Sequence, residues 1–401
     1  MSTFGLDGVL SWTQAHQVAA TCAGPLPTAY ARLDEAAGSW LAEPIVTLAD
    51  DPVADAAAYD GYALCGEGPW RRVPHERLSP GECFWVSTDA LLPEHTDCVL
   101  PAASAHVQTT GDHALVVARD DLTGLADERV RPDFGAGIVR QAERSTAGMQ
   151  LLARDRLVTP SVLSLAAAIG LDELPVVRPP VVGTLVLGSS LLTHGLPRNG
   201  RVRDALGMSV PAFVGALGAR GNPAVRASDT RDLLLAEIDD ANVDVLITTG
   251  STAPEPDNHV RQVLRDLGAR WLIDGVASTP GAQMLMAKLP DDRILIGLPG
   301  EPVSALAGLV TLVAPLIASL RGAPQPARTS AVLVEDAPVA DFADDTCLAP
   351  VRLERTESAT IARPIGTGLR AWANADGIAV VPPGAGYRGD VVDVLSLRPT
   401  D

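Results

Sequence analysis

The run RILIGLPGEPVSALAGLVTLVAPLIASL at residues 293–320 constrains the fold of this chain more than any other segment. It predicts a short apolar strand, a Leu-Pro-Gly corner and a helix that is apolar almost all round. Pro302 suits the first helical turn, where the amide that it lacks would have no partner, and Glu301 places a carboxylate at the positive end of the helix dipole. In an open parallel sheet such a corner, here within residues 298–301, lies at the carboxyl edge, where ligands bind.

The same alternation of strand and helix extends upstream. Residues 181–187 and 243–249 are short, β-branched and bounded by glycine, which predicts buried strands. Helical patterns follow, and together they predict a doubly wound α/β domain with helices on both faces of its sheet. The loops 188–204, 250–257 and 298–301 would then meet at one edge, and topology alone makes them the predicted site. The helical patterns span 204–219, 229–241 and 258–269.

Outside this region the pattern changes twice. Residues 46–139 predict a β-rich insertion, with a hairpin over 106–118 around Gly111-Asp112, while 7–41 and 140–178 have helical character. The Pro-rich segment 322–326 predicts a linker, and the strand-like runs after it predict a small C-terminal β domain.

Composition and charge exclude several classes of function. The 401 residues include 31 basic and 49 acidic side chains, a net charge of −18, so we expect no nucleic-acid partner. Five scattered cysteines without a C-x-x-C pair fit a reducing cytoplasm and indicate no zinc site. The first residues lack the features of a signal peptide, and the apolar run 305–320 is shorter than the roughly 20 residues of a membrane span, so it predicts a buried helix.

Five short motifs, in order along nearly the whole chain, identify a family resemblance. The chain resembles the molybdopterin molybdotransferases, which include bacterial MoeA and the C-terminal part of gephyrin. The motifs are Tyr59-Asp60-Gly61-Tyr62-Ala63, Thr88-x-Ala90-x-Leu92-Pro93-Glu94, Thr249-Gly250 followed by Asp257, Pro280-Gly281, and Leu298-Pro299-Gly300-x-Pro302-Val303-Ser304-Ala305.

The resemblance implies a multidomain architecture and a homodimer. Residues 1–45 and 140–179 would form one elongated helical domain from which the β-rich domain 46–139 projects. Residues 180–323 would form a molybdopterin-binding-type α/β domain, and 324–401 a small β barrel-like domain. One subunit's residues 46–139 would lie near the α/β site of the other subunit.

The reaction implied by the resemblance takes adenylylated molybdopterin and molybdate, hydrolyses the adenylate with a divalent cation such as Mg²⁺, and leaves molybdenum on the molybdopterin. Asp60, Asp204 and Asp257 match carboxylates of the family and are the predicted catalytic residues, with Asp204 and Asp257 as metal ligands. Helix capping explains Asp204 and Asp257 equally well. The predicted ligand-binding residues are Thr88, Gly188, Ser189, Ser190, Arg201, Arg203, Gly250, Ser251, Pro280, Gly281, Pro299, Gly300, Glu301, Pro302 and Ser304.

Several polar groups of the family are replaced in this chain. Thr279 and Ala282 stand where lysines flank the Pro-Gly step, and Glu301 stands where the family has asparagine. A glutamate there would compete with a bound oxyanion for the helix N-terminus. Arg201, Arg203 or Lys288 would have to supply positive charge instead.

Two hypotheses therefore remain open. The first is a molybdenum-cofactor protein that binds molybdopterin or its adenylate and inserts molybdenum. The second is a non-catalytic relative that serves as a dimeric scaffold for another protein.

Overall fold

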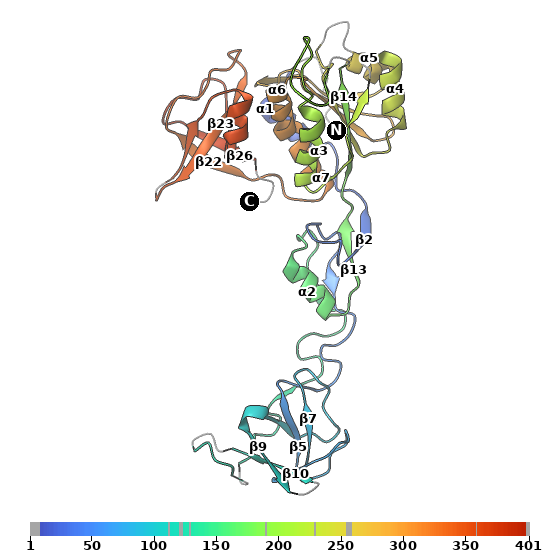
Figure 1. The fold of residues 1–401 in the computed structure, drawn as a ribbon, viewed down its shortest axis with the longest axis vertical. Helices are drawn as coiled ribbons and strands as arrows, with labels where there is room; N and C mark the ends of the chain where they lie inside the picture. Colours follow the sequence, from blue (N-terminus) through green and yellow to red (C-terminus); the bar gives the residue numbers. More distant parts are fainter. Residues whose placement is uncertain are drawn as a thin grey trace.

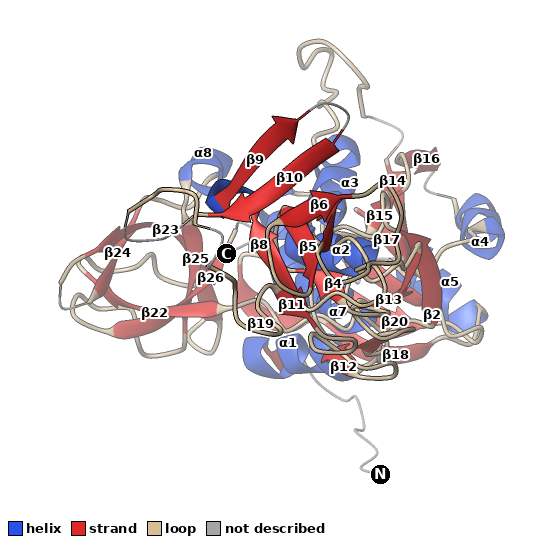
Figure 2. Ribbon diagram, turned by 90° about the horizontal axis from the view of Figure 1, so that it is seen from below, coloured by secondary structure: helices blue, strands red, loops and turns tan. Residues whose placement is uncertain are grey.

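The computed structural model describes residues 9–110, 113–119, 123–127, 130–188, 191–227, 230–253, 259–357 and 359–397. The chain is long and narrow (Figure 1), with an α/β core and a β barrel side by side at one end and a β-rich module at the other. A slender stalk of two chain passages joins the ends. The view along the long axis (Figure 2) also shows the barrel lying beside the core.

The core sheet is mixed, so the expectation of a parallel sheet holds for only part of it. Its strand order is β15-β14-β17-β21-β20-β18, with β16 also paired to β14. The strands β14, β15, β16, β17 and β21 run parallel, whereas β20 and β18 are antiparallel, because β20 returns beside β21. The strands are β14 (Val181–Leu187), β15 (Arg220–Gly221), β16 (Val225–Ala227), β17 (Val245–Thr249), β18 (Arg270–Asp274), β20 (Leu285–Lys288) and β21 (Ile294–Leu298).

Helices cover both faces of this sheet, as the sequence predicts. α4 (Arg231–Asp240) and α5 (His259–Asp266) bury leucine, isoleucine and valine side chains against one face. α3 (Leu206–Ala216) and the run from Pro302 to Leu320 cover the other face, together with α1 (Trp12–Thr21). That run comprises α6 (Pro302–Gly308), a π-helical turn η2 (Leu309–Val313) and α7 (Ala314–Leu320).

The run Pro302–Leu320 is 19 residues long and apolar enough to cross a membrane by length and composition. However, 83% of its most apolar window is buried inside the protein. Its side chains contact α1, α3 and the sheet, so it is the central helix of the core, as its sequence predicts.

The stalk is built mainly from paired strands, which corrects the expectation of an elongated helical domain. Two two-stranded ladders follow one another along it, and α2 (Pro160–Ala168) lies beside them. α1 packs on the α/β core instead. The alanine-rich pattern favours helix locally, but each segment meets a partner strand that satisfies its backbone. The ladders are β2 (Thr28–Arg32) with β13 (Glu173–Val177) and β3 (Ile45–Val46) with β12 (Gln150–Leu152). A third ladder, β4 (Ala56–Ala57) with β11 (Ile138–Val139), packs into the core of the β-rich module.

The β-rich module contains a six-stranded sheet in the order β8-β5-β7-β6-β10-β9. The predicted hairpin is confirmed, since β9 pairs with β10 in antiparallel register, although Gly111-Asp112 lies outside the described residues. The elements are β5 (Gly61–Cys65), β6 (Trp70–Arg72), β7 (Glu82–Val86), β8 (Cys98–Pro101), the 3-10 turn η1 (Ala102–Ser104), β9 (Ala105–Thr110) and β10 (His113–Ala118).

The C-terminal domain is a closed five-stranded barrel. β22 pairs with both β24 and β26, β25 pairs with β26 and β23, and β23 pairs with β24, which completes the ring. One strand of the α/β segment, β19 (Val276–Thr279), pairs with β1 (Leu10–Ser11) and with β23, and so joins barrel and core. The barrel elements are β22 (Arg328–Leu333), β23 (Thr346–Arg355), β24 (Thr360–Pro364), β25 (Gly377–Val381), β26 (Val391–Ser396) and α8 (Leu369–Asn374).

Candidate functional site

The three loops predicted from topology follow strands that end level with one another. Register pairs Val186 with Thr249 and Thr249 with Leu298, so β14, β17 and β21 reach the same edge. The Gly250 amide donates to the Leu298 carbonyl at 2.8 Å, and a Cβ on Gly300 would lie 3.3 Å from the Gly250 Cα. The loops after β17 and β21 therefore touch through glycines. Ser189, Ser190 and Asp257 lie outside the described residues.

The Pro280-Gly281 step lies at the same edge. It precedes β20, whose first residue Leu285 pairs with Gly297 near the end of β21. Gly281 has a φ of +104°, and a Cβ on it would lie 3.3 Å from the Ser304 carbonyl oxygen. The step thus packs against the first turn of α6, and glycine fits both its backbone conformation and this close approach.

Glu301 caps the helix that follows the Leu-Pro-Gly corner. Its Oε1 accepts a hydrogen bond from the Val303 amide at 3.0 Å, and its Oε2 accepts one from the Ser304 amide at 2.6 Å. Since Pro302 has no amide hydrogen, these are the first donors of the helix. The predicted competition is therefore built into the structure, because a side-chain carboxylate already holds the donors that an oxyanion would use.

Asp204 is held by the protein on both carboxylate oxygens. Oδ1 accepts from the amides of Leu206 and Gly207 at 3.0 and 2.8 Å, and Oδ2 accepts from the Arg226 guanidinium. The capping alternative is thus observed. Mg²⁺ binds carboxylate oxygens in a near-octahedral shell, and a guanidinium on Oδ2 opposes a second cation there. Asp204 does not fit a metal ligand, and the described residues contain no group of three potential metal-binding side chains.

The loop between β14 and α3 folds back on itself, with a short antiparallel hairpin at Arg198–Arg201 and a parallel bridge between Leu192 and Arg203 at its base. The Leu192 amide donates to the Val202 carbonyl at 2.8 Å, and the Arg201 guanidinium donates to the Leu191 carbonyl at 3.2 Å. Arg201 and Arg203 are exposed on this loop next to the edge. Lys288 is not at this edge, because it pairs with Ile294 at the start of β21 and forms an ion pair with Asp292.

Asp60 and Thr88 lie together, but in the β-rich module. Asp60 Oδ1 accepts from the Thr88 amide at 2.7 Å and from the Thr88 hydroxyl at 3.0 Å, and these bonds lower the pKa of Asp60. Asp60 directly precedes β5, and β5 and β7 stand at the far end of the stalk from α3 and α6 (Figure 1). A single chain therefore does not bring Asp60 and Thr88 to the α/β edge.

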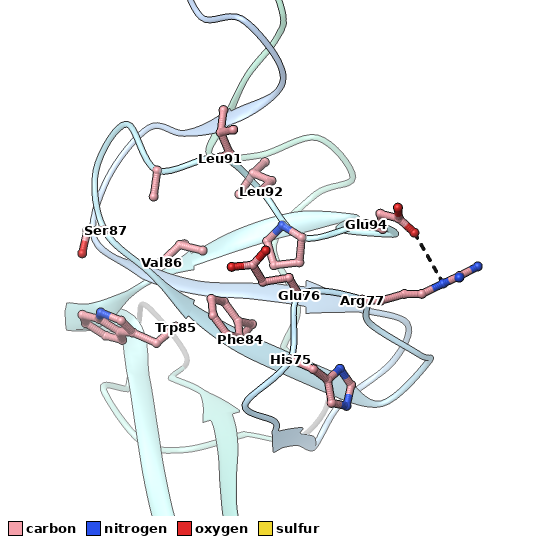
Figure 3. Close-up of a pocket in the computed structure, with 12 residues that line it drawn as sticks. His75, Glu76, Arg77, Phe84, Trp85, Val86, Ser87, Leu91, Leu92 and Glu94 are labelled. Atoms are coloured by element: carbon pink, nitrogen blue, oxygen red, sulfur yellow. Dashed lines mark ion pairs between the residues drawn. The ribbon is translucent and has the colours of Figure 1, made fainter.

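A groove of about 1020 Å³ crosses the β-rich module (Figure 3). The predicted motif at residues 88–94 supplies one wall through Leu91, Leu92 and Glu94, and Phe84 and Trp85 from β7 supply another. The lining mixes apolar side chains with the charged Glu76, Arg77 and Glu94, and it includes Ser87, which directly precedes Thr88.

Two arginines at the α/β edge were missed by sequence reasoning. Arg226 lies on β16, whose three residues carry no clear strand pattern. Arg261 lies on α5; its Nε donates to the Thr252 carbonyl at 3.0 Å, its guanidinium pairs with Asp274 at the end of β18, and it lies over the Trp271 ring. It therefore connects the loop after β17 to β18, which lies at the far side of the sheet beyond β21 and β20. Neither arginine belongs to a motif, so only the tertiary contacts reveal their positions.

Two family models match this chain, one over its N-terminal region and one over the α/β core. Residues 10–170 match the model of the "MoeA N-terminal region (domain I and II)", and residues 183–319 match that of a "Probable molybdopterin binding domain". The second match contains the three loops at the carboxyl edge.

Individual relatives agree over almost the full length. The chain is 28% identical to the molybdopterin molybdenumtransferase of Bacillus subtilis, covering 92% of this chain and 90% of the relative. It is 25% identical to the protein of the same name from Staphylococcus aureus, covering 92% and 85%. Its fold is similar to the crystal structure of a molybdopterin biosynthesis MoeA protein from Pyrococcus horikoshii, with a TM-score of 0.73, 22% identity and coverage of 97% and 99%. The chain therefore belongs to the MoeA family and is a molybdopterin molybdenumtransferase-like protein of molybdenum cofactor biosynthesis.

Proposed function

We propose that this chain binds molybdopterin or its adenylate at the carboxyl edge of the core sheet and takes part in inserting molybdenum from molybdate. The observation that carries this proposal is the meeting of the loops after β14, β17 and β21 within the segment that matches the molybdopterin-binding family model. Such an edge is the general ligand site of α/β sheets.

The residues at this edge support an anionic ligand only in part. The loop after β14 presents Arg201 and Arg203, which suit phosphate and molybdate oxyanions through their planar donors. Gly250 and Gly300 let the loops after β17 and β21 approach each other closely, because a side chain on either glycine would fill the space between them. Glu301 opposes an anion at the helix start. Asp204 does not fit a ligand of Mg²⁺, because the Arg226 guanidinium holds its Oδ2.

Calorimetric titration of the full chain with molybdopterin and with its adenylate tests the proposal. We expect micromolar binding, and release of the adenylate in the presence of molybdate would establish turnover. Replacing Arg201 and Arg203 with glutamine should weaken binding about tenfold or more, since charge-assisted hydrogen bonds are lost. Arg198→Gln, on the same loop, is the matched control. Absence of binding to both compounds would refute the proposal.

A second candidate function is a non-catalytic scaffold that binds another protein. Two observations favour it, namely the occupied helix start at Glu301 and the use of Thr279 as a contact to the barrel, where its hydroxyl donates to Asp345 at 2.8 Å. Failure to bind molybdopterin would direct the search to protein partners.

We further propose a homodimer in which the β-rich module of one subunit faces the α/β edge of the other. This arrangement would bring Asp60 and Thr88 to the ligand, which a single chain does not. The mass of one chain is 41.7 kDa, and light scattering at micromolar concentration should give twice this value. A monomer would contradict both the dimer and the shared site.

We also propose a cytoplasmic location. All five cysteines are free thiols, and four of them are buried. Disulfides are typical of oxidising compartments, so this arrangement supports a reducing one.

A further inference from the structure

Arg226 lies where the family resemblance implies a divalent cation. It is on β16, which runs parallel to β14 with Val186 opposite Arg226, so it stands one residue before the carboxyl edge. Its guanidinium pairs with Asp204, the residue expected to hold metal. A fixed positive charge from the protein therefore occupies Oδ2 of that carboxylate.

The surroundings of Asp204 favour its ion pair with Arg226. The Asp204 side chain is only 2% exposed, whereas that of Arg226 is 43% exposed. A buried carboxylate needs a compensating charge, and a guanidinium provides it with directed hydrogen bonds. Gly207 completes the arrangement, because a Cβ at this position would lie 2.4 Å from Asp204 Oδ2. The absence of a side chain there leaves the space in which Oδ2 turns toward Arg226.

We propose that Arg226 is an internal counter-cation that takes the place of a divalent metal ion at Asp204. The exposed part of its guanidinium then faces the edge and is available to a phosphate or molybdate oxygen of the ligand. This last consequence rests on the proposed function, whereas the exclusion of metal from Asp204 does not. Arg226 is thus a specificity-determining residue. It favours an anionic ligand that binds at this edge with no metal ion between the ligand and Asp204.

Titration with Mg²⁺ alone tests the exclusion, with no pterin present. Asp204→Asn removes the charge but keeps an oxygen for the Leu206 and Gly207 amides. Because the proposal assigns no metal to Asp204, wild type and D204N should bind Mg²⁺ within twofold of each other. A loss of affinity of tenfold or more in D204N would overturn the proposal.

Variants of Arg226 test its role as the substitute cation. Arg226→Gln leaves Asp204 charged and without its counter-ion, so Mg²⁺ should raise the thermal midpoint of R226Q but not that of the double variant D204N/R226Q. Arg220→Gln, on β15, which also pairs in parallel with β14, is the matched control and should not respond. Equal responses of R226Q and the double variant would overturn the proposal.

The result of the Mg²⁺ experiments does not depend on whether the chain binds molybdopterin. Metal binding is measured without molybdopterin, so failure to bind molybdopterin would leave the result for Asp204 and Arg226 intact. If R226Q does not fold, the comparison of wild type with D204N still decides, because the asparagine preserves the cap of α3. Far-ultraviolet circular dichroism of each variant establishes that it is folded before titration.

Discussion

At the scale of single residues, Thr279 illustrates how a family position has been put to another use. Its hydroxyl donates to Asp345 Oδ2 at 2.8 Å and accepts from the Asp341 amide at 3.1 Å. Asp345 is buried, and both partners belong to the segment that leads into β23 of the barrel. A lysine at this position would lose these contacts. Thr279 therefore connects the α/β domain to the barrel, whereas a lysine would be available to bind an anionic ligand.

Removing that hydroxyl should therefore destabilise the protein. Thr279→Val keeps the shape of the side chain but leaves the Asp345 carboxylate without this donor, which costs about 1–3 kcal/mol. Thr279→Ser retains the hydroxyl and should stay within about 0.5 kcal/mol of wild type. Urea unfolding of both variants measures the difference. Equal stability of the valine and serine variants would contradict the role assigned to the hydroxyl.

Neutralising Glu301 should strengthen anion binding. Glu301→Gln removes the negative charge from the helix start, where such charges contribute about 0.3–1 kcal/mol. We expect the affinity for molybdate alone to rise about two- to fivefold. Glu301→Asp keeps the charge and should bind as wild type does. If calorimetry gives the same affinity for the glutamine and aspartate variants, the helix start lies outside the anion site.

The sequence predicts some of these residue roles and misses others for a physical reason. The capping roles of Asp204 and Glu301 follow from their positions before a helix, because capping depends on neighbours along the chain. The pairs Arg226–Asp204 and Thr279–Asp345 join residues 22 and 66 positions apart. Such contacts depend on the order of the strands, which no local pattern specifies.

At the scale of secondary structure elements, the π-helical turn Leu309–Val313 is the surface on which α1 packs. Thr311 in this turn accepts a hydrogen bond from the Trp12 indole at 2.9 Å through its hydroxyl, and its carbonyl contacts His16 Nδ1 at 3.1 Å. Trp12 and His16 stack on each other, and both are buried. π-helical turns free carbonyls from the regular ladder, which explains how Thr311 can serve α1.

His16 should make this junction sensitive to acid. Burial, aided by the charge of Arg328, lowers the pKa of His16 from 6.5 to about 4. The unfolded chain takes up the proton first, so stability falls as the pH drops from about 6.5 toward 4 and is unaffected by this group above that range. Between pH 7 and 5 the loss is about 2 kcal/mol. Urea unfolding at both pH values should show a smaller loss in His16→Gln, and an equal loss in both proteins would exclude His16 as the cause.

Elements whose local pattern and tertiary environment agree were predictable. β14 has the predicted bounds, and the helix after the Leu-Pro-Gly corner begins at the predicted Pro302. Residues 28–32 were wrongly given helical character, since β2 is held by its pairing with β13, a partner more than 140 residues away. The antiparallel strands β18 and β20 were not foreseen, because short strands next to an α/β repeat give no pattern of their own.

At the scale of the whole molecule, two arginines fasten the stalk to the α/β core. Arg178 makes a bidentate pair with Asp244 at 2.9 and 2.7 Å. Arg321 donates to the Leu217 carbonyl of the core and to the Gly38 carbonyl of the stalk. These contacts hold the upper end of the stalk at two points, which limits the angles that it can adopt relative to the core.

Removing both clamps should loosen the molecule without unfolding its domains. In the double variant R178A/R321A, we expect small-angle X-ray scattering to show a broader distribution of distances between the core and the β-rich module. Circular dichroism should be unchanged. Arg32→Ala, which removes an exposed stalk arginine paired only with nearby Asp34, is the control. An unchanged distribution in the double variant would mean that the ladders alone set the direction of the stalk.

The pairing of β19 with β23 has a consequence for how such a chain can be divided in evolution. The barrel is closed on itself, yet it also hydrogen-bonds to a strand that belongs to the α/β segment, and its Trp372 and Ile378 are buried in the core cluster. A shortened gene that stopped at the Pro-rich linker would leave β19 with an unpaired edge and uncover apolar side chains, both of which promote aggregation. We therefore expect a division of the gene at this linker to be selected against, because neither piece would cover the surface that barrel and core share.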